Sequence, residues 1–183
     1  MNDVAERHTT DNELLALVDE KDRVISAMSR RDIHAGSLRH RAVHILVNDR
    51  QGRVLLQKRS KHKDVHPGAW DTSAAGHVDY GESYALAAQR ELKEELGIVL
   101  NEPPCMLHKI DACEENGWEF VGVFRVLHDG PIQPDAFEID KVEWLTAEAV
   151  DDLIHAQIEP VTLSFQNIWS LCRSNHAWLS EGA

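Results

Sequence analysis

The sequence predicts a single domain in which a mixed β-sheet is combined with a few helices. Three observations predict this class. The length of 183 residues is typical of one domain, β-rich runs recur between residues 40 and 145, and one clear amphipathic helix lies among them. The chain contains no internal repeat and no low-complexity linker. We therefore expect an α/β or α+β domain over residues 1–183, with a loose polar segment at 1–11.

The first half of the chain reads mainly as strands. Two short apolar runs flank the polar DEKD within residues 13–29 and predict a hairpin, and residues 30–39 form a connector with a helical turn. Two further strands, joined by the turn DRQG, are expected at 40–49 and 53–60. A basic, proline-containing loop then precedes a short strand that ends at Gly76; these segments are 61–68 and 69–78.

The second half opens with the clearest helix, from Ser83 to Leu96. Ser83 suits the N-cap and Gly97 suits the position after the last turn. Its apolar stripe consists of Ala85, Ala88, Leu92 and Leu96. Strands are expected at 106–115, 118–128 and 141–145; Thr146 caps a helix over 147–157, and Pro160 precedes a last helix over 161–173.

Composition excludes several classes of protein. The net charge of −12 argues against a broad nucleic-acid surface, although a divalent cation can still bridge acidic side chains and a phosphorylated ligand. The sequence offers neither an apolar secretory signal nor a membrane-spanning run. The cysteines Cys105, Cys113 and Cys172 are odd in number and widely spaced, so we expect reduced thiols and a cytoplasmic location.

Three carboxylates gather on one face of the helix at 83–96. Glu91, Glu94 and Glu95 lie at i, i+3 and i+4, within an arc of roughly 100° at 3.6 residues per turn. Like charges at these spacings destabilise a helix, and a bound Mg²⁺ or Mn²⁺ would offset the repulsion. Taken alone, the three glutamates are also consistent with a solvated, charge-rich helix face.

The surrounding residues extend this cluster into a longer motif. They follow the spacing G-x5-E-x7-R-E-x2-E-E-x-G, made by Gly76, Glu82, Arg90, Glu91, Glu94, Glu95 and Gly97. This pattern resembles the Nudix box without a departure. The resemblance implies an α/β/α sandwich, a loop–helix–loop site, and Mg²⁺- or Mn²⁺-dependent hydrolysis of a diphosphate linked to another moiety.

The resemblance also implies a role for each residue of the motif. Glu91, Glu94 and Glu95 bind the metal, with help from the carbonyl of Gly76, and Glu91 or a nearby carboxylate acts as the base. Arg90 orients the glutamates, and Glu82 holds the loop in place and lies in the outer coordination shell of the metal. Outside the box, Glu138 is a candidate for the extra carboxylate of many Nudix hydrolases.

From about His34 to Trp144 the chain also resembles type 1 isopentenyl-diphosphate isomerases, which have the Nudix fold. That resemblance implies a possible second site in which His40 and His77 bind a metal and Glu119 matches the catalytic glutamate. His34 lies near a third histidine ligand but one residue out of register. Histidines on a strand, such as His40 and His44, are equally consistent with ordinary core or surface positions.

Two departures count against isomerase activity. Ala75 replaces the cysteine that moves a proton, and Gly117 replaces a further glutamate ligand. Isomerisation needs an acid and a base on opposite faces of the allylic system, and alanine is neither. The favoured hypothesis is hydrolysis of a nucleoside diphosphate linked to another group, or of a related small molecule. The alternatives are an isomerase-like enzyme and a non-catalytic nucleotide-binding module.

Substrate contacts are expected in the basic segment, with Lys58 and Arg59 as candidate phosphate ligands beside Gln57, Lys61 and Lys63. A basic loop of this kind is also often only solvated. Trp70 is expected in the core, and Trp118 borders the pocket. The expected partners are a small-molecule diphosphate and, as in many Nudix proteins, a second copy of the chain.

Overall fold

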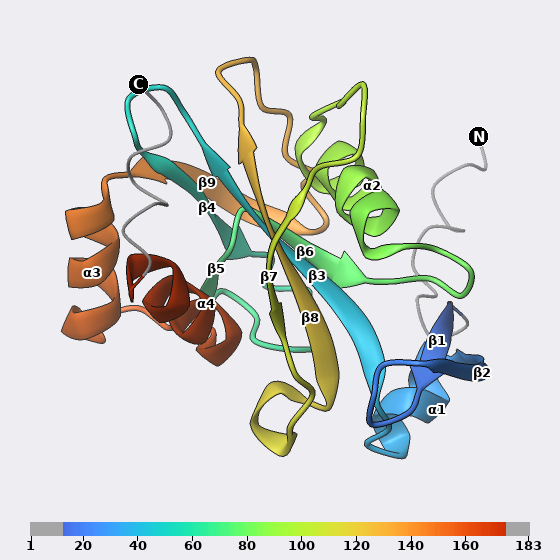
Figure 1. Cartoon of the computed structure of the whole chain (residues 1–183). Helices are drawn as coiled ribbons and strands as arrows, with labels where there is room; N and C mark the ends of the chain where they lie inside the picture. Colours follow the sequence, from blue (N-terminus) through green and yellow to red (C-terminus); the bar gives the residue numbers. More distant parts are fainter. Residues whose placement is uncertain (1–12, 175–183) are drawn as a thin grey trace, which may run out of the picture.

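The computed structural model describes residues 13–174, and its centre is a mixed seven-stranded sheet (Figure 1). The strands β5, β4, β3, β8 and β7 follow one another across this sheet, while β6 also pairs with β3 and β9 with β4. The strands of this sheet are β3 (His40–Asn48), β4 (Val54–Arg59), β5 (Trp70–Asp71), β6 (Ala74–His77), β7 (Met106–Ile110), β8 (Glu119–Leu127) and β9 (Ile139–Leu145).

Strand β3 organises the sheet. It runs parallel to β8 along its whole length, with His40 opposite Glu119. On its other side it pairs with β6 through Ala42–Ile45 and with β4 only at Val47 and Asn48. Almost every residue of β3 is buried, including the polar His40, His44 and Asn48, because neighbouring strands and both layers cover the strand.

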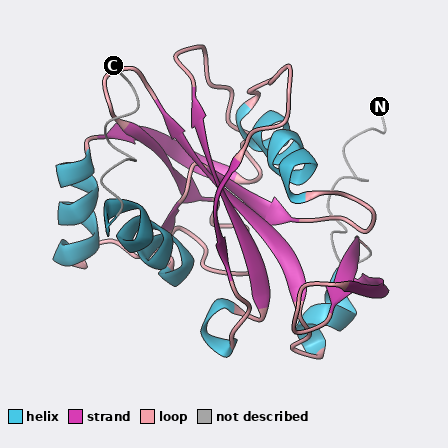
Figure 2. Cartoon of the chain, in the orientation of Figure 1, coloured by secondary structure: helices cyan, strands magenta, loops and turns pink. Residues whose placement is uncertain are grey.

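Helices cover the two faces of the sheet (Figures 1 and 2). Helix α2 (Tyr84–Leu96) packs on one face through Ala88, Leu92 and other apolar residues. Helices α3 (Ala147–Ala156) and α4 (Leu163–Ser174) pack on the opposite face. Successive strand residues point to opposite faces, so Leu55 of β4 belongs to the α2 side and Leu56 to the α3–α4 side.

A small unit precedes the main sheet. It consists of the antiparallel pair β1 (Leu14–Val18) and β2 (Val24–Ser29), followed by the short helix α1 (Arg30–Ala35). Asp22, in the β1–β2 turn, fastens the unit to the sheet. Its side chain accepts hydrogen bonds from Arg41 Nε at 2.6 Å and from Tyr84 OH at 3.0 Å, and it pairs with Lys109.

Most of the expected elements are present. Ser83 Oγ accepts from Leu86 N, Gly97 adopts φ 68°, and Thr146 Oγ1 accepts from Ala149 N, as the capping argument requires. The single strand expected at 69–78 is instead two strands, β5 and β6, and β6 continues past Gly76 to His77 because His77 pairs with Ala42. The expected loose segment at 1–11 lies outside the described residues.

The remaining expectations about class concern cysteines and membrane crossing. The three cysteines are free thiols, of which Cys172 alone is buried. Within residues 13–174, no helix has the length and apolar character needed to cross a membrane.

Candidate functional site

The residues of the box meet around one guanidinium, that of Arg90 on α2. Arg90 Nε and Nη2 donate to Glu82 at 3.2 and 3.0 Å, and Nη1 donates to Glu91 at 2.5 Å and to Glu94 at 3.2 Å. Nη2 also donates to the carbonyl oxygen of His77 at 2.9 Å. Arg90 therefore links the loop that precedes α2 to the acidic face of the helix.

Gly76 lies directly against the carboxylate of Glu91. A Cβ at position 76 would stand 2.1 Å from Glu91 Oε1, closer than real side chains approach one another. The requirement for glycine here is thus a close approach and does not come from a left-handed backbone. Burial raises the pKa of Glu91 to about 7, against the opposing charge of Arg90.

Glu95 is buried on the sheet side of α2. Its Oε2 accepts from Gln57 Nε2 at 2.9 Å and from the backbone nitrogen of Ala75 at 3.3 Å. Burial raises the pKa of Glu95 well above its ordinary value, and the charges of Glu91 and Glu138 add to the effect. Glu138, the expected carboxylate outside the box, forms an ion pair with Lys63 beside this site.

The three glutamates are close but do not converge on one point. Among residues 13–174, the side chains whose possible metal-binding atoms all lie within 4.8 Å of one another are three histidines, His34, His40 and His77. The three glutamates do not form such a group. Arg90 holds the oxygens of Glu91 and Glu94, and Glu95 turns towards Gln57. In this arrangement the guanidinium supplies the positive charge that the acidic cluster needs.

The chemistry of the donors nevertheless fits a hard divalent cation. Glu91 and Glu95 are 8% and 6% exposed, and two neighbouring carboxylates that are buried this far favour a cation or a proton beside them. The side chain of Glu94 is 59% exposed, so it can turn away from Arg90 at little cost.

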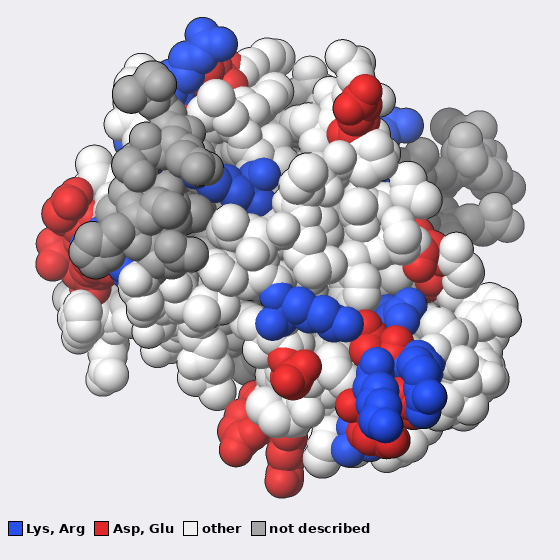
Figure 3. Space-filling model, viewed as in Figure 1, with Lys and Arg blue, Asp and Glu red and all other residues white. Residues whose placement is uncertain are grey.

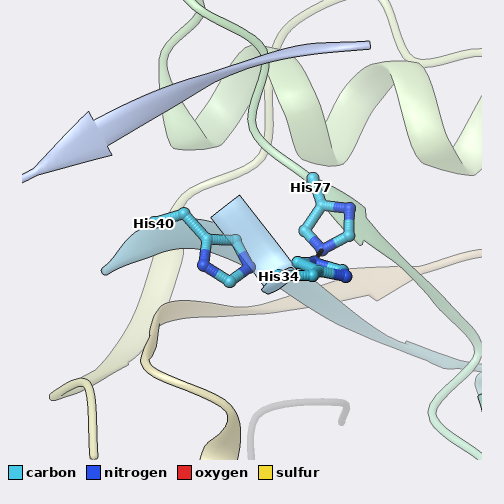
Figure 4. A group of neighbouring side chains, drawn as sticks. All are labelled: His34, His40 and His77. Carbon is cyan, nitrogen blue, oxygen red and sulfur yellow. Dashed lines mark hydrogen bonds between the residues drawn. The ribbon is translucent and has the colours of Figure 1, made fainter. Parts of the chain in front are cut away.

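A second cluster of side chains joins three separate elements (Figure 4). His34 comes from α1, His40 begins β3 and His77 ends β6. The three ring centroids lie 5.1 Å from one another, and His34 Nε2 is 3.3 Å from His77 Nε2. Helix α1 brings His34 beside the other two histidines, although its register relative to the isomerase pattern differs by one residue.

Glu119 completes the cluster. Its Oε1 lies 3.4 Å from His40 Nε2 and 3.5 Å from His77 Nε2. Burial opposes ionisation of Glu119, but the contacts with the two histidines outweigh it and lower the pKa of the carboxyl. Burial lowers the pKa of His77, and it lowers the pKa of His34 to about 4, so these rings are neutral at pH 7.

The two candidate phosphate ligands, Lys58 and Arg59, contact different residues. Lys58 lies on the α3–α4 side, where it pairs with Glu159 and stands 5.6 Å from the ring centroid of Trp70. Lys58 thus faces away from the glutamates. Arg59 donates to Asp71 at 3.4 Å and to the carbonyl of Val65 at 3.1 Å. Their role as phosphate ligands stays a prediction.

The two tryptophans occupy different environments. Trp70 is 3% exposed and packs in the core, which confirms that expectation. Trp118 is half-buried and stacks against Arg39, with the guanidinium carbon 4.9 Å from the ring centroid. On the face drawn in Figure 3, basic side chains interleave with acidic ones and form no continuous patch.

Sequence reasoning missed one group near the box. Glu13, which precedes β1, is brought to the loop because Leu15 bridges to Asp79 and Tyr80 N donates to the carbonyl of Leu14. Burial raises the pKa of Glu13 to about 6, and the charge of Asp79 adds to this. No sequence signal identifies Glu13, because it is distant from the box along the chain.

The fold, the capped helix and the residues around Arg90 together define a Nudix-domain protein. In agreement, a family model described as NUDIX domain matches residues 38–165. An uncharacterized Nudix hydrolase of Yersinia pestis is 37% identical over 164 residues, which cover 89% of this chain and 88% of that protein. The chain therefore belongs to the Nudix hydrolase family.

Other relatives agree with this assignment. The uncharacterized Nudix hydrolase YfcD of Escherichia coli K12 is 35% identical over 146 residues, covering 79% of this chain and 80% of that protein. The crystal structure of DR0079 from Deinococcus radiodurans superposes with a TM-score of 0.76 at 29% identity, over 87% of this chain and 99% of that one. The more specific resemblance to isopentenyl-diphosphate isomerases is not confirmed by these relatives and stays a prediction.

Proposed function

We propose that this protein is an Mg²⁺- or Mn²⁺-dependent hydrolase that cleaves a diphosphate linkage in a nucleoside diphosphate joined to another group, or in a related small molecule. The observation that carries the proposal is the convergence of Glu82, Glu91 and Glu94 on Arg90, with Gly76 packed against Glu91. This arrangement joins every charged position of the box except Glu95, which lies on the adjacent buried side of the same helix.

The proposed metal ligands are Glu91, Glu94, Glu95 and the carbonyl oxygen of Gly76. When bound, the divalent ion polarises a phosphoryl oxygen and lowers the pKa of a water molecule. Glu91 and Glu94 each contact Arg90 through one carboxylate oxygen, Oε1 and Oε2 respectively, so the other oxygen of each would be available to the ion. Arg90 retains Glu82 and the His77 carbonyl as partners, so it continues to fix the loop relative to α2.

The protein's own groups supply the remaining parts of the reaction. The proposed base is Glu91 or a nearby carboxylate of the box; burial raises the pKa of Glu91 to about 7 in the metal-free protein, and a bound cation would lower it again. Arg59 and Lys63 are the proposed phosphate contacts. Lys58 joins this set only if its pairing with Glu159 is broken.

Ala75 argues against the isomerase alternative. Its backbone nitrogen donates to Glu95 at 3.3 Å, but its methyl side chain has no acid or base group. Residue 75 therefore cannot transfer the proton that isomerisation of an allylic substrate needs. A non-catalytic nucleotide-binding module is the other alternative, and it has no need for the complete set of box glutamates.

A substrate panel with matched variants tests the proposal. The purified protein is incubated with ADP-ribose, a dinucleoside polyphosphate, a nucleotide sugar and isopentenyl diphosphate, with Mg²⁺, with Mn²⁺ or with chelator, and phosphate-containing products are measured. We expect metal-dependent cleavage of at least one diphosphate. Glu94→Gln/Glu95→Gln abolishes it, whereas Glu148→Gln, an exposed change on α3, does not.

Each contrary result has a distinct meaning. Hydrolysis that survives Glu94→Gln/Glu95→Gln rejects the assigned site. Migration of the double bond in isopentenyl diphosphate rejects hydrolysis in favour of isomerisation, and nucleotide binding without turnover favours the binding module. Sedimentation equilibrium of the same samples tests the expected homodimer.

A further inference from the structure

Each glutamate of the box is held in place through one of its carboxylate oxygens. Arg90 Nη1 donates to Glu91 Oε1 at 2.5 Å and to Glu94 Oε2 at 3.2 Å. Glu95 is held differently, because its Oε2 accepts from Gln57 Nε2 at 2.9 Å. Gln57 thus contacts Glu95 in the way that Arg90 contacts the other two glutamates.

The sheet explains why Gln57 reaches the buried side of α2. Gln57 follows Leu55 on β4 by two residues, so alternation along the strand directs both side chains to the α2 side. Beyond Leu55, β4 no longer pairs with β3, whereas β6 pairs with the same edge of β3 through residues Ala42–Ile45. The carboxylate of Glu95 joins the two strands, because the Ala75 nitrogen on β6 donates to the same Oε2 at 3.3 Å.

Burial makes this contact hard to exchange. Gln57 is 2% exposed and Glu95 is 6% exposed. A buried amide N–H or carboxylate that loses its partner pays the cost of desolvation, so each of these groups favours the contact with the other. A side chain that is already ordered also loses less conformational entropy when it binds an ion.

Gln57 orients the carboxylate without cancelling its charge. The amide of glutamine donates hydrogen bonds but is neutral, whereas the guanidinium of Arg90 is always charged. Lys63, in the loop after β4, forms an ion pair with Glu138. Both donors to Glu95 act on Oε2, so Oε1 is left for another partner, and an anionic oxygen suits a hard divalent cation.

We propose that Gln57 is a positioning residue for the glutamate centre, in which its amide fixes Glu95 Oε2 and leaves Oε1 to the divalent cation. The inference rests on the proposed function, because the cation is the one that the box glutamates bind there. Hydrogen-bond partners that orient metal ligands typically change metal affinity by about 10–100-fold when they are removed. The amide of Gln57 is therefore not a phosphate contact, although Gln57 is adjacent to Lys58 in the chain.

Binding of Mn²⁺ to the full chain, without substrate, tests the inference. Free Mn²⁺ is measured by electron paramagnetic resonance during a titration, and the glutamate centre is the binding that Glu94→Gln/Glu95→Gln removes. Gln57→Leu, which is similar in size but has no amide, is expected to weaken this binding about tenfold or more. The matched control is Gln89→Leu on the same helix, which removes a 2.8 Å hydrogen bond from Gln89 Nε2 to the carbonyl of Leu100.

Two further measurements separate positioning from a purely structural role. Urea denaturation of the metal-free proteins is expected to show lower midpoints for both Gln57→Leu and Gln89→Leu, whereas Mn²⁺ affinity falls only in Gln57→Leu. In hydrolysis assays, Gln57→Leu needs about tenfold more Mn²⁺ for its half-maximal rate, while KM for the diphosphate at saturating Mn²⁺ stays within about twofold. Gln57→Asn, whose amide is one methylene too short for Glu95 Oε2, changes in the same direction, so the test does not depend on one variant folding.

The contrary outcomes are distinct. Equal Mn²⁺ affinity in the parent, Gln57→Leu and Gln57→Asn overturns the inference and leaves the proposed hydrolase unaffected. Equal losses of affinity in Gln57→Leu and Gln89→Leu overturn it as well, since they show a general effect on α2. A raised KM with unchanged Mn²⁺ affinity overturns it in favour of a substrate contact. A parent protein without any Mn²⁺ binding that Glu94→Gln/Glu95→Gln removes rejects the proposed function itself, and the inference with it.

Discussion

Replacement of Gly76 by alanine perturbs the site in the most direct way. The new methyl group would lie 2.1 Å from Glu91 Oε1 and 2.2 Å from its Cδ, whereas ordinary van der Waals contact begins at 3.4 Å. The carboxylate must therefore move by about 1.3 Å, the difference between 3.4 and 2.1 Å. Such a displacement also breaks the 2.5 Å contact between Glu91 and Arg90.

The magnitude of the effect follows from this displacement. Overpacking in a well-packed region costs about 1–3 kcal/mol of stability. The smaller conformational freedom of alanine in the unfolded chain offsets up to about 1 kcal/mol. We expect a net loss of about 1–2 kcal/mol in the free energy of unfolding. A catalytic group misplaced by about 1 Å lowers the rate by about 10²-fold, so hydrolysis falls far more than stability does.

Urea denaturation and steady-state hydrolysis of the best panel substrate measure the two effects. Gly81→Ala is the matched control, because Gly81 lies in the nearby loop between β6 and α2, has φ +87° and a Cβ there meets nothing within 4 Å. We expect it to lose stability through backbone strain while its folded fraction retains activity. In a Glu91→Asp background the shorter side chain leaves room, so Gly76→Ala costs less stability there. Equal costs in both backgrounds, or full activity of Gly76→Ala, would refute the reasoning.

Three further outcomes are expected. First, the pKa of Glu13 is raised to about 6, so the metal-free folded state binds this proton more tightly than the unfolded state does. The free energy of unfolding therefore falls as pH rises from 4.5 to about 6. Glu13→Gln is expected to flatten this part of a plot of unfolding free energy against pH, and an unchanged slope in the variant contradicts the raised pKa of Glu13. Second, Asp22→Asn lowers the unfolding free energy by about 3 kcal/mol, because Arg41 and Lys109 lose a buried counter-charge while asparagine tolerates the same backbone conformation. Urea denaturation measures the loss, and a loss below about 1 kcal/mol counts against the role of Asp22. Third, Ser83→Ala lowers the free energy of unfolding by about 1 kcal/mol, because α2 loses its N-cap. Thermal unfolding detects this as a lower midpoint than that of the parent protein, and an unchanged midpoint contradicts the role of the cap.

Elements with a strong local signal were predictable. Helix α2 begins at the capping Ser83 and ends at the left-handed Gly97, since both residues act through their own backbone and nearest neighbours. Strands β3 and β8 were also recognised from apolar, β-branched runs. The division of residues 69–78 into β5 and β6 was not predictable, because these segments pair with different partners, β4 and β3, that lie elsewhere in the sequence.

The two candidate sites show the same contrast. The spacing of Glu91, Glu94 and Glu95 already placed them on one helix face, because helical periodicity is a local property. The membership of His34 in the histidine cluster was obscured, since the position of α1 relative to β6 depends on how the N-terminal hairpin packs. Sequence spacing also grouped Lys58 with Arg59, whereas in the structure Lys58 pairs with Glu159 and Arg59 with Asp71.

By itself, the sequence determined the box, the helix that carries its glutamates and the class of fold, because these follow from residue types at short, fixed separations. Only the tertiary structure shows that Gly76 touches Glu91, that Arg90 links the loop to the helix, and that three histidines from three elements meet, two of them in contact with Glu119. Contacts between residues far apart in the chain depend on how the sheet and helices pack, and the local sequence around each residue does not determine that packing.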